Sequence, residues 1–284
     1  MSETLESIVV SIDINDDMTY ISYAALSGKG VTTLSSRQNA EKYGIPTFMY
    51  MDESTLKWSF GANAFVRSQQ SRGRLYDHVL SDVIRGTGED KEALKRLGTF
   101  LAHALELAAA EVDKEYMHPD IVALSICLKE INTHILELME QCVHPLKAIV
   151  KDIRFLTRAE CFYYYTLSQP PEIWRSSVLL VDYSQDDCCF SHLKIKKGIQ
   201  YSVAAIDEEH HFEMLPFDDG DVSGMDERLM TLLKSTLTDG SGMRVSSVYL
   251  SGLNLEGSWA KNTLNFLCNG RRVFQGQNLY TKGA

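Results

Sequence analysis

The sequence predicts an α/β protein built from two related halves. Apolar, β-rich segments alternate with segments whose apolar residues recur every three or four positions, which is the order typical of layered α/β domains. In addition, the segment SIVVSIDINDDMTY at residues 7–20 has a counterpart in SSVLLVDYSQDDCCFS at residues 176–191. We therefore expect one lobe at residues 1–170 and a second at residues 171–284.

The first half is expected to open with a β-meander and to continue with alternating helices and strands. Apolar residues spaced by three and four between Leu94 and Val112 predict a long helix, with Thr87 as its N-cap and Asp90 three residues further on. Residues 120–128 are apolar almost throughout, which is typical of a central strand covered on both faces. In order, the sequence predicts a hairpin at 7–14 and 18–26, a strand near 31–34, a second hairpin within 45–61 that starts at Pro46, an irregular, solvated segment at 62–88, a helix over 94–112, a strand at 120–128, a helix over 131–142, a strand at 147–156 and a short helix at 159–168.

The second half repeats this order in a shorter form. Its hairpin is expected to turn at residues 184–187, as the first hairpin turns at residues 15–17. The predicted elements are strands at 178–183, 188–195 and 198–207, an exposed acidic loop at 208–221, a helix over 225–236, a strand at 245–253 and a helix over 258–267.

Composition and charge exclude several functional classes. The formal net charge of -10 argues against a nucleic-acid surface, which needs clustered Lys and Arg. No apolar stretch reaches the roughly 20 residues that span a bilayer, and the N-terminus lacks the features of a signal peptide. The six cysteines include no C-x-x-C pair, so neither structural zinc nor a disulfide framework is expected. We therefore expect a cytoplasmic protein without membrane insertion.

The two hairpins share more than their polar turns. Asp13 and Asp182 each end an apolar strand, and each is followed within five residues by two adjacent aspartates. Ser22 and Ser191 both lie nine residues after these leading aspartates. A strand that ends in a polar turn is common, so one copy alone is uninformative. Two copies, each opening a β-meander, favour an internal duplication.

The order of segments resembles the actin-like ATPase superfamily of actin, sugar kinases and heat-shock chaperones, and is most similar to the chaperone branch. The resemblance spans nearly the whole chain and depends on the order of short motifs. Residues 13–17 take the place of an Asp-Leu-Gly-Thr-Thr turn, and residues 182–187 that of Asp-Leu-Gly-Gly-Gly-Thr. The other matching positions are Ile45 with Pro46, Gly61 with Ala64, Ser223 to Leu229, Leu250 to Gly252, and Gly283 with Ala284.

The resemblance implies a two-lobed actin-like, ribonuclease H-like fold with a duplicated β-meander, α/β blocks and reduced upper subdomains. It also implies ATP or ADP with magnesium as ligand, and Asp13 and Asp182 as the residues on the magnesium side. The chain stops inside what the family makes its last helix, so we expect a truncated C-terminal lobe and a longer parent protein. The implied nucleotide-binding residues are Asp13, Asn15, Asp16, Asp182, Ser184, Gln185, Asp186, Ser251 and Gly252.

Departures from the family pattern weaken the expectation of catalysis. The family's turns hold phosphates with the backbone N–H groups of glycines, whereas this chain has aspartates there. At about 5 Å and an effective dielectric near 20, each carboxylate–phosphate pair costs about 3 kcal/mol. Several such pairs exceed the roughly 8 kcal/mol of micromolar binding, unless a divalent cation lies between the charges.

Two other candidate sites have a second interpretation each. Residues 158–162, which begin with Arg158, align with the family's catalytic Glu-Pro-Thr-Ala-Ala segment, and Glu160 is displaced by two positions from the family's glutamate. Glu160 either orients water or stabilises the start of a helix. His210 and His211 stand among glutamates and form either a metal site or part of the expected acidic loop. The catalytic residues therefore stay unidentified.

Two functions remain open after the sequence is read. The first is a degenerate chaperone-like domain with weak or no nucleotide hydrolysis that acts as a protein-interaction or regulatory module, and it implies a protein partner. The second is a working, metal-dependent ATPase of the heat-shock chaperone type. The aspartates in both turns favour the first.

Overall fold

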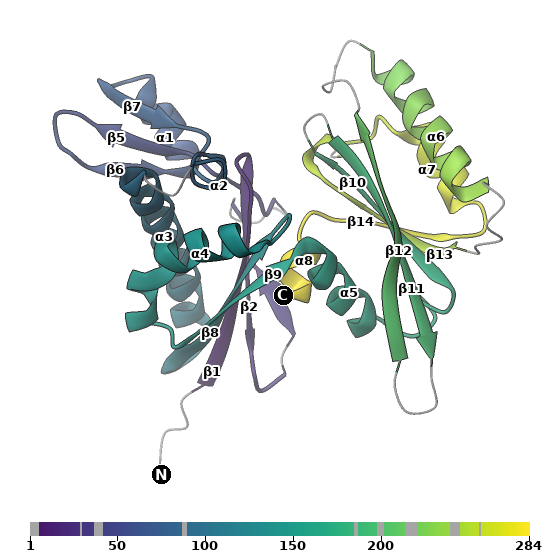
Figure 1. Ribbon diagram of the computed structural model, residues 1–284, viewed down its shortest axis with the longest axis horizontal. Helices are drawn as coiled ribbons and strands as arrows, with labels where there is room; N and C mark the ends of the chain where they lie inside the picture. The colour runs from purple at the N-terminus through teal and green to yellow at the C-terminus, as the bar shows by residue number, and fades with distance from the viewer. Residues whose placement is uncertain are drawn as a thin grey trace. The chain divides into compact units, whose positions relative to one another are not determined.

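The computed structural model describes residues 6–28, 30–36, 42–86, 90–184, 187–197, 202–213, 221–238, 245–255 and 257–284 (Figure 1). The chain is a mixed α/β protein with two compact units. Residues 1–161 together with 280–284 form unit 1, and residues 162–279 form unit 2. Unit 1 thus ends before residue 170, and the last five residues belong to it rather than to the second half of the chain. None of the described helices is long and apolar enough to cross a membrane.

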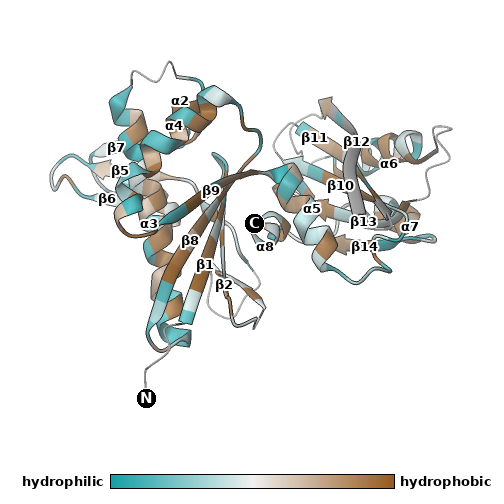
Figure 2. Ribbon diagram, turned by 60° about the horizontal axis from the view of Figure 1, so that its bottom comes forward, coloured by the Kyte–Doolittle hydropathy of each residue, from teal (hydrophilic) through white to brown (hydrophobic). Residues whose placement is uncertain are grey.

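Unit 1 contains a six-stranded sheet with the order β3-β2-β1-β8-β9 and a short strand, β4, paired with β2. The expected meander is confirmed: β1 and β2 are antiparallel, while β1, β8 and β9 run parallel. Strand β8 is an interior strand between β1 and β9, and β1 and β8 are largely hydrophobic (Figure 2). The bounds are β1 Glu6–Ile14, β2 Met18–Ala25, β3 Val31–Thr33, β4 Ile45–Pro46, β8 Pro119–Leu128 and β9 Asp152–Thr157.

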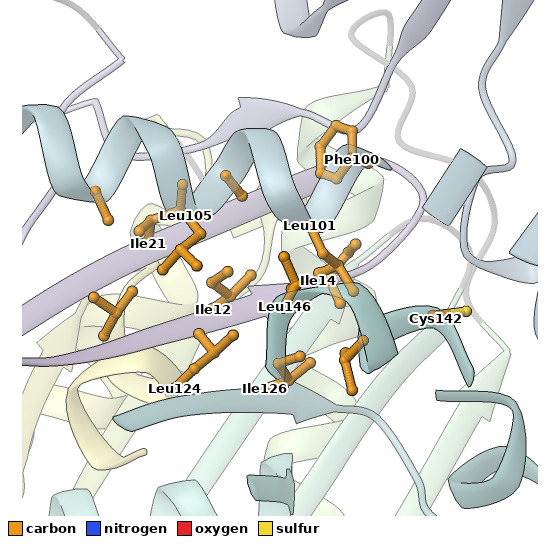
Figure 3. Packing of buried hydrophobic residues seen from close by; sticks show 14 of the residues in the cluster. Ile12, Ile14, Ile21, Phe100, Leu101, Leu105, Leu124, Ile126, Cys142 and Leu146 are labelled. Carbon is orange, nitrogen blue, oxygen red and sulfur yellow. The ribbon is translucent and has the colours of Figure 1, made fainter. Parts of the chain in front are cut away.

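Two helices build the core of unit 1 against one face of this sheet. They are α3 (Lys91–Glu115) and α4 (Thr133–Val143). Figure 3 shows Leu105 of α3 on the side of Ile12 of β1 and Leu101 on the side of Ile14, and all four side chains are buried. The cap of α3 differs from the prediction, because the Asp90 side chain accepts hydrogen bonds from the second and third N–H groups of the helix, while Thr87 lies outside the described residues.

Two segments of unit 1 were predicted wrongly. Residues 62–88 are not simply irregular, because they contain α1 (Gly61–Ser68), β7 (Gly73–Tyr76) and α2 (Ser81–Ile84). Strand β7 pairs with β5 (Met49–Asp52), which also pairs with β6 (Trp58–Phe60), to form a separate three-stranded sheet. The predicted strand at 147–156 is shorter, since a 3-10 helix, η1 (His144–Ala148), precedes β9.

Unit 2 contains a five-stranded sheet with the order β12-β11-β10-β13-β14. Helices α6 and α7 pack against one face of it through a second apolar core. The bounds are β10 Ser177–Ser184, β11 Asp187–Lys197, β12 Ser202–Glu213, α6 Val222–Thr238, β13 Val245–Ser251, η2 Leu253–Leu255, α7 Lys261–Cys268 and β14 Arg272–Gln275. The acidic loop expected from residue 208 is wrong at its start, because β12 continues to Glu213, and β14 was not predicted.

The two sheets have the same strand order and the same pattern of parallel and antiparallel neighbours. In both, the leading aspartate pairs with the residue seven positions later: Asp13 with Tyr20 and Asp182 with Cys189. Both also contain a register shift in the parallel ladder five residues before that aspartate, after Ile8 and after Ser177. The two sheets therefore agree not only in strand order but also in the position of this register shift, which the strand order does not require.

The second face of each sheet carries a short helix. In unit 1, α8 (Leu279–Gly283) contributes Thr281, whose hydroxyl accepts from Ser22 and whose carbonyl accepts from Ser11. In unit 2, α5 (Arg158–Ser168) contributes Phe162, which is buried against Tyr249 of β13. The next aromatic residues of α5 include Tyr164, which is 49% exposed, so the aromatic run combines helix packing with an exposed face.

Candidate functional site

Asp13 is held in a buried ion pair. It lies near the end of β1, between Tyr20 of β2 and Cys127 of β8. Both of its carboxylate oxygens accept from Arg158, with Nε to Oδ1 at 3.0 Å and Nη2 to Oδ2 at 3.1 Å. The Asp13 side chain is 2% exposed and that of Arg158 14%. Such a two-point pair fixes the position of both groups.

The position of Arg158 follows from the sheet. Arg158 is the first residue of α5 and directly follows β9, and the carboxyl ends of β1, β8 and β9 lie at one edge because these strands are parallel. The sequence comparison matched Arg158 to the family's catalytic segment and assigned it no partner. An arginine directly after a strand parallel to β1 is the signal that would have located it.

Apolar and weakly polar groups enclose this ion pair. The Arg158 guanidinium carbon lies 4.9 Å from the centre of the Tyr280 ring. Burial, reinforced by a hydrogen bond to Cys161, raises the pKa of the Cys127 thiol well above its usual value. Cys127 therefore stays protonated near neutral pH and does not act as a thiolate.

In the first polar turn, the side chains of Asn15 and Asp16 accept hydrogen bonds from backbone N–H groups of unit 1. Asn15 Oδ1 accepts from the N–H groups of Asp17 and Met18, both at 2.8 Å. Asp16 Oδ1 accepts from the N–H groups at the start of α2, Leu80 at 2.9 Å and Ser81 at 3.0 Å. Asp16 thus caps a helix within unit 1, a role that the sequence did not reveal because its partner lies 64 residues away.

The corresponding turn of unit 2 is described in part. Asp182 pairs in register with Ser251 of the parallel strand β13, and its Oδ1 accepts from the Ser184 hydroxyl at 3.1 Å. Gln185 and Asp186 lie outside the described residues. The structure thus brings Asp182, Ser184 and Ser251 together at the carboxyl edge of this sheet.

Gly252, which follows β13, has both of its backbone polar groups bound by one side chain. Gln277 Oε1 accepts from the Gly252 N–H, and Gln277 Nε2 donates to the Gly252 carbonyl, both at 2.8 Å. The φ of Gly252 is +101°, and a Cβ placed there would lie 2.2 Å from the Tyr183 carbonyl oxygen. Glycine is required at this position because β10 passes so close. Gln277 was not singled out from the sequence.

The remaining candidates have structural roles or stay undefined. Glu160 Oε2 accepts from the N–H and the hydroxyl of Thr157, and the Thr157 hydroxyl accepts from the Glu160 N–H. This is a capping box at the start of α5, which accounts for both residue types. His210 lies on β12, and among the residues that the structure describes no group of three or more His, Cys, Asp or Glu is arranged to hold a metal ion.

The chain is thus an α/β protein with two features at the carboxyl ends of its parallel strands. In unit 1, Asp13 forms an ion pair with Arg158, and in unit 2, the Gln277 side chain binds both backbone polar groups of Gly252. Residues 30–284 match the family described as "Family of unknown function (DUF5716) C-terminal", and the chain belongs to this family. No curated protein matches the chain.

Proposed function

We propose that the chain is a degenerate domain of the actin-like ATPase fold that acts as a protein-interaction or regulatory module, with weak or no nucleotide hydrolysis. The observation that carries this proposal is the buried ion pair between Asp13 and Arg158. By sequence resemblance, Asp13 corresponds to the magnesium-side aspartate of the actin-like ATPase superfamily, and here both of its carboxylate oxygens accept hydrogen bonds from the Arg158 guanidinium.

The matching sheets support the fold assignment. A duplicated domain should repeat the strand order, the strand directions and local irregularities in both halves. The two sheets agree in all three, including the register shifts after Ile8 and Ser177. The β-meander followed by parallel strands is also the order that the resemblance to the actin-like superfamily implies.

The contacts of the two turns support the loss of nucleotide binding. To take magnesium, Asp13 would have to give up both hydrogen bonds to the Arg158 guanidinium, and breaking a buried ion pair costs about 3–5 kcal/mol. A phosphate or ribose that approaches Gly252 would have to displace Gln277 from both backbone groups. These costs add to the repulsion between aspartates and phosphate.

The nucleotide experiment is calorimetric titration of the whole chain with ATP and with ADP, each with and without magnesium. We expect no saturable heat in any of the four titrations. Thermal melting of the same samples adds an independent readout, because a ligand at 100 times its dissociation constant stabilises by about 2.7 kcal/mol. Micromolar, magnesium-dependent binding that Asp182→Ala abolishes would support the working ATPase instead.

The interaction role has its own test. If the turns no longer take nucleotide, binding of a protein partner should not depend on ATP. Partners captured on the immobilised chain with ATP and magnesium should therefore equal those captured without them. A partner that is released by ATP from the parent chain, and retained by Asp182→Ala, would contradict the proposal.

A further inference from the structure

A polar cavity of 600 Å³ lies in unit 2, at the end of the sheet that is remote from Asp182. It is formed where β10, β13 and β14 begin, because Ser176, Val245 and Arg272 all line it. Asp182 is five residues further along β10, or about 17 Å at 3.3 Å per residue. The cavity is therefore separate from the turns described above. Its lining also includes Glu172, Arg175, Ser246, Cys268, Gly270 and Arg271.

The charge of this cavity is opposite to that of the chain. Three arginines and one glutamate line it, giving a local charge of +2, whereas the whole chain carries -10. Within the described part of the chain, none of Arg175, Arg271 and Arg272 forms an ion pair. The three guanidiniums repel one another, and the one carboxylate of the lining, Glu172, offsets only one of their charges, so an anion in the cavity would be favoured.

Two residues that line the cavity, Ser246 and Arg271, contact neighbouring elements of unit 2. The Ser246 hydroxyl lies within hydrogen-bond distance of two carbonyl groups, those of Ile173 at 2.9 Å and Ser177 at 3.0 Å, which ties the start of β13 to the segment that carries Arg175. The Arg271 guanidinium lies 5.6 Å from the centre of the Phe266 ring of α7. The start of β13 thus contributes to the lining of the cavity, and Arg271 lies near the Phe266 ring of α7.

The size and the donors of the cavity define a class of ligand. A volume of 600 Å³ lies within the range of small-molecule sites, and a polar, arginine-rich lining does not suit an apolar ligand. Arginine binds phosphate through two parallel N–H groups, and a phosphate monoester carries a charge of about -1.5 to -2 at neutral pH. That charge matches the +2 of the lining.

We propose that this cavity binds a phosphate monoester, carried either by a small metabolite or by a phosphorylated side chain of a partner protein. The proposal does not depend on the function proposed for the two turns. It assigns Arg175 and Arg272 as the phosphate ligands, with Arg271 completing the positive charge.

The experiment titrates the whole chain with phenyl phosphate, with O-phospho-L-serine, and with a phosphoserine peptide and its unphosphorylated form. We expect saturable binding of the phosphorylated compounds, and no binding of the unphosphorylated peptide. Each of Arg175→Ala and Arg272→Ala should weaken the affinity about tenfold or more, because each removes charge-assisted hydrogen bonds. Arg228→Ala, an exposed arginine of α6 outside the cavity, is the matched control and should leave the affinity unchanged.

Cys268 offers a second readout that does not require calorimetry. It lines the cavity and is exposed, whereas the other five cysteines are buried or half-buried. Bound phosphate monoester should slow the reaction of this thiol with a disulfide reagent in the parent protein, and should not slow it in Arg272→Ala. Circular dichroism of each variant checks that it is folded.

The outcomes separate the two sources and can overturn the proposal. Equal affinity for free phosphoserine and the phosphopeptide indicates a metabolite, and tighter binding of the peptide indicates a phosphorylated partner. The proposal fails if none of the phosphorylated compounds binds, if acetate and succinate bind as well as phenyl phosphate, or if folded Arg175→Ala and Arg272→Ala bind like the parent.

Discussion

Removing Arg158 tests the buried ion pair on which the proposed function depends. Arg158→Met should destabilise unit 1 by about 3–5 kcal/mol, because it leaves the Asp13 carboxylate, 2% exposed, without its counter-charge. Asp13→Asn in the same chain removes that charge, so the double variant should be more stable than Arg158→Met alone. The matched control is Arg154→Ala, which breaks a pair with Asp152 whose members are 67% and 45% exposed and should cost about 0–1 kcal/mol.

The assay must separate the two units, because one unfolding curve would mix their transitions. Amide hydrogen exchange at increasing urea, read on peptides from α3 and from α6, reports on unit 1 and unit 2 respectively. We expect the loss of protection in α3 only. The reasoning is refuted if folded Arg158→Met is no less stable than Arg154→Ala, or if adding Asp13→Asn lowers the stability further.

Three other predictions concern single positions. Gly252→Ala should lower the melting temperature much more than Gly257→Ala. Both glycines have a positive φ, +101° and +98°, but only at Gly252 would the new Cβ lie within 4 Å of another atom, the Tyr183 carbonyl oxygen of β10 at 2.2 Å. Equal melting temperatures would contradict this close approach. Asp16→Ala should cost about 1 kcal/mol in urea denaturation by removing the cap of α2, and Asp17→Ala should cost less; the reverse order would exclude the capping role. Burial lowers the pKa of His103 from its usual 6.5, because the folded state favours the neutral imidazole. The contribution of His103 to stability is therefore complete above pH 6.5 and is lost as the pH falls through the lowered pKa. Urea midpoints between about pH 7 and about pH 5 should therefore fall more steeply for the parent than for His103→Gln, and parallel profiles would argue against this assignment.

Local patterns were sufficient for the strongly periodic elements. The apolar spacing from Leu94 to Val112 predicted α3, and the continuous apolar run at 120–128 predicted the interior strand β8. Both signals arise from burial against the sheet or within it, which selects the residue type at each position. The weakly apolar segments failed, because β7 and β14 are short strands whose formation depends on partners distant in the sequence.

The candidate site was predicted less completely than the fold. Sequence comparison located Asp13 and Asp182 at the ends of matching strands, and the structure places them at equivalent registers. It did not predict that Arg158 pairs with Asp13, nor that Gln277 binds Gly252. These partners lie 145 and 25 residues away, and no local pattern records a contact of that kind.

By itself, the sequence determined the α/β class, the repeated hairpin and the negative charges in the two turns, because hydrophobic period and residue type are properties of neighbouring positions. Only the tertiary structure decided which partners Asp13 and Asp16 have. Parallel strands bring their carboxyl ends to one edge, so that an arginine after β9 reaches an aspartate at the end of β1 and neutralises it. In the other sheet, the parallel strands β10, β13 and β14 bring three arginines together where these strands begin, around the cavity that we propose as a phosphate site.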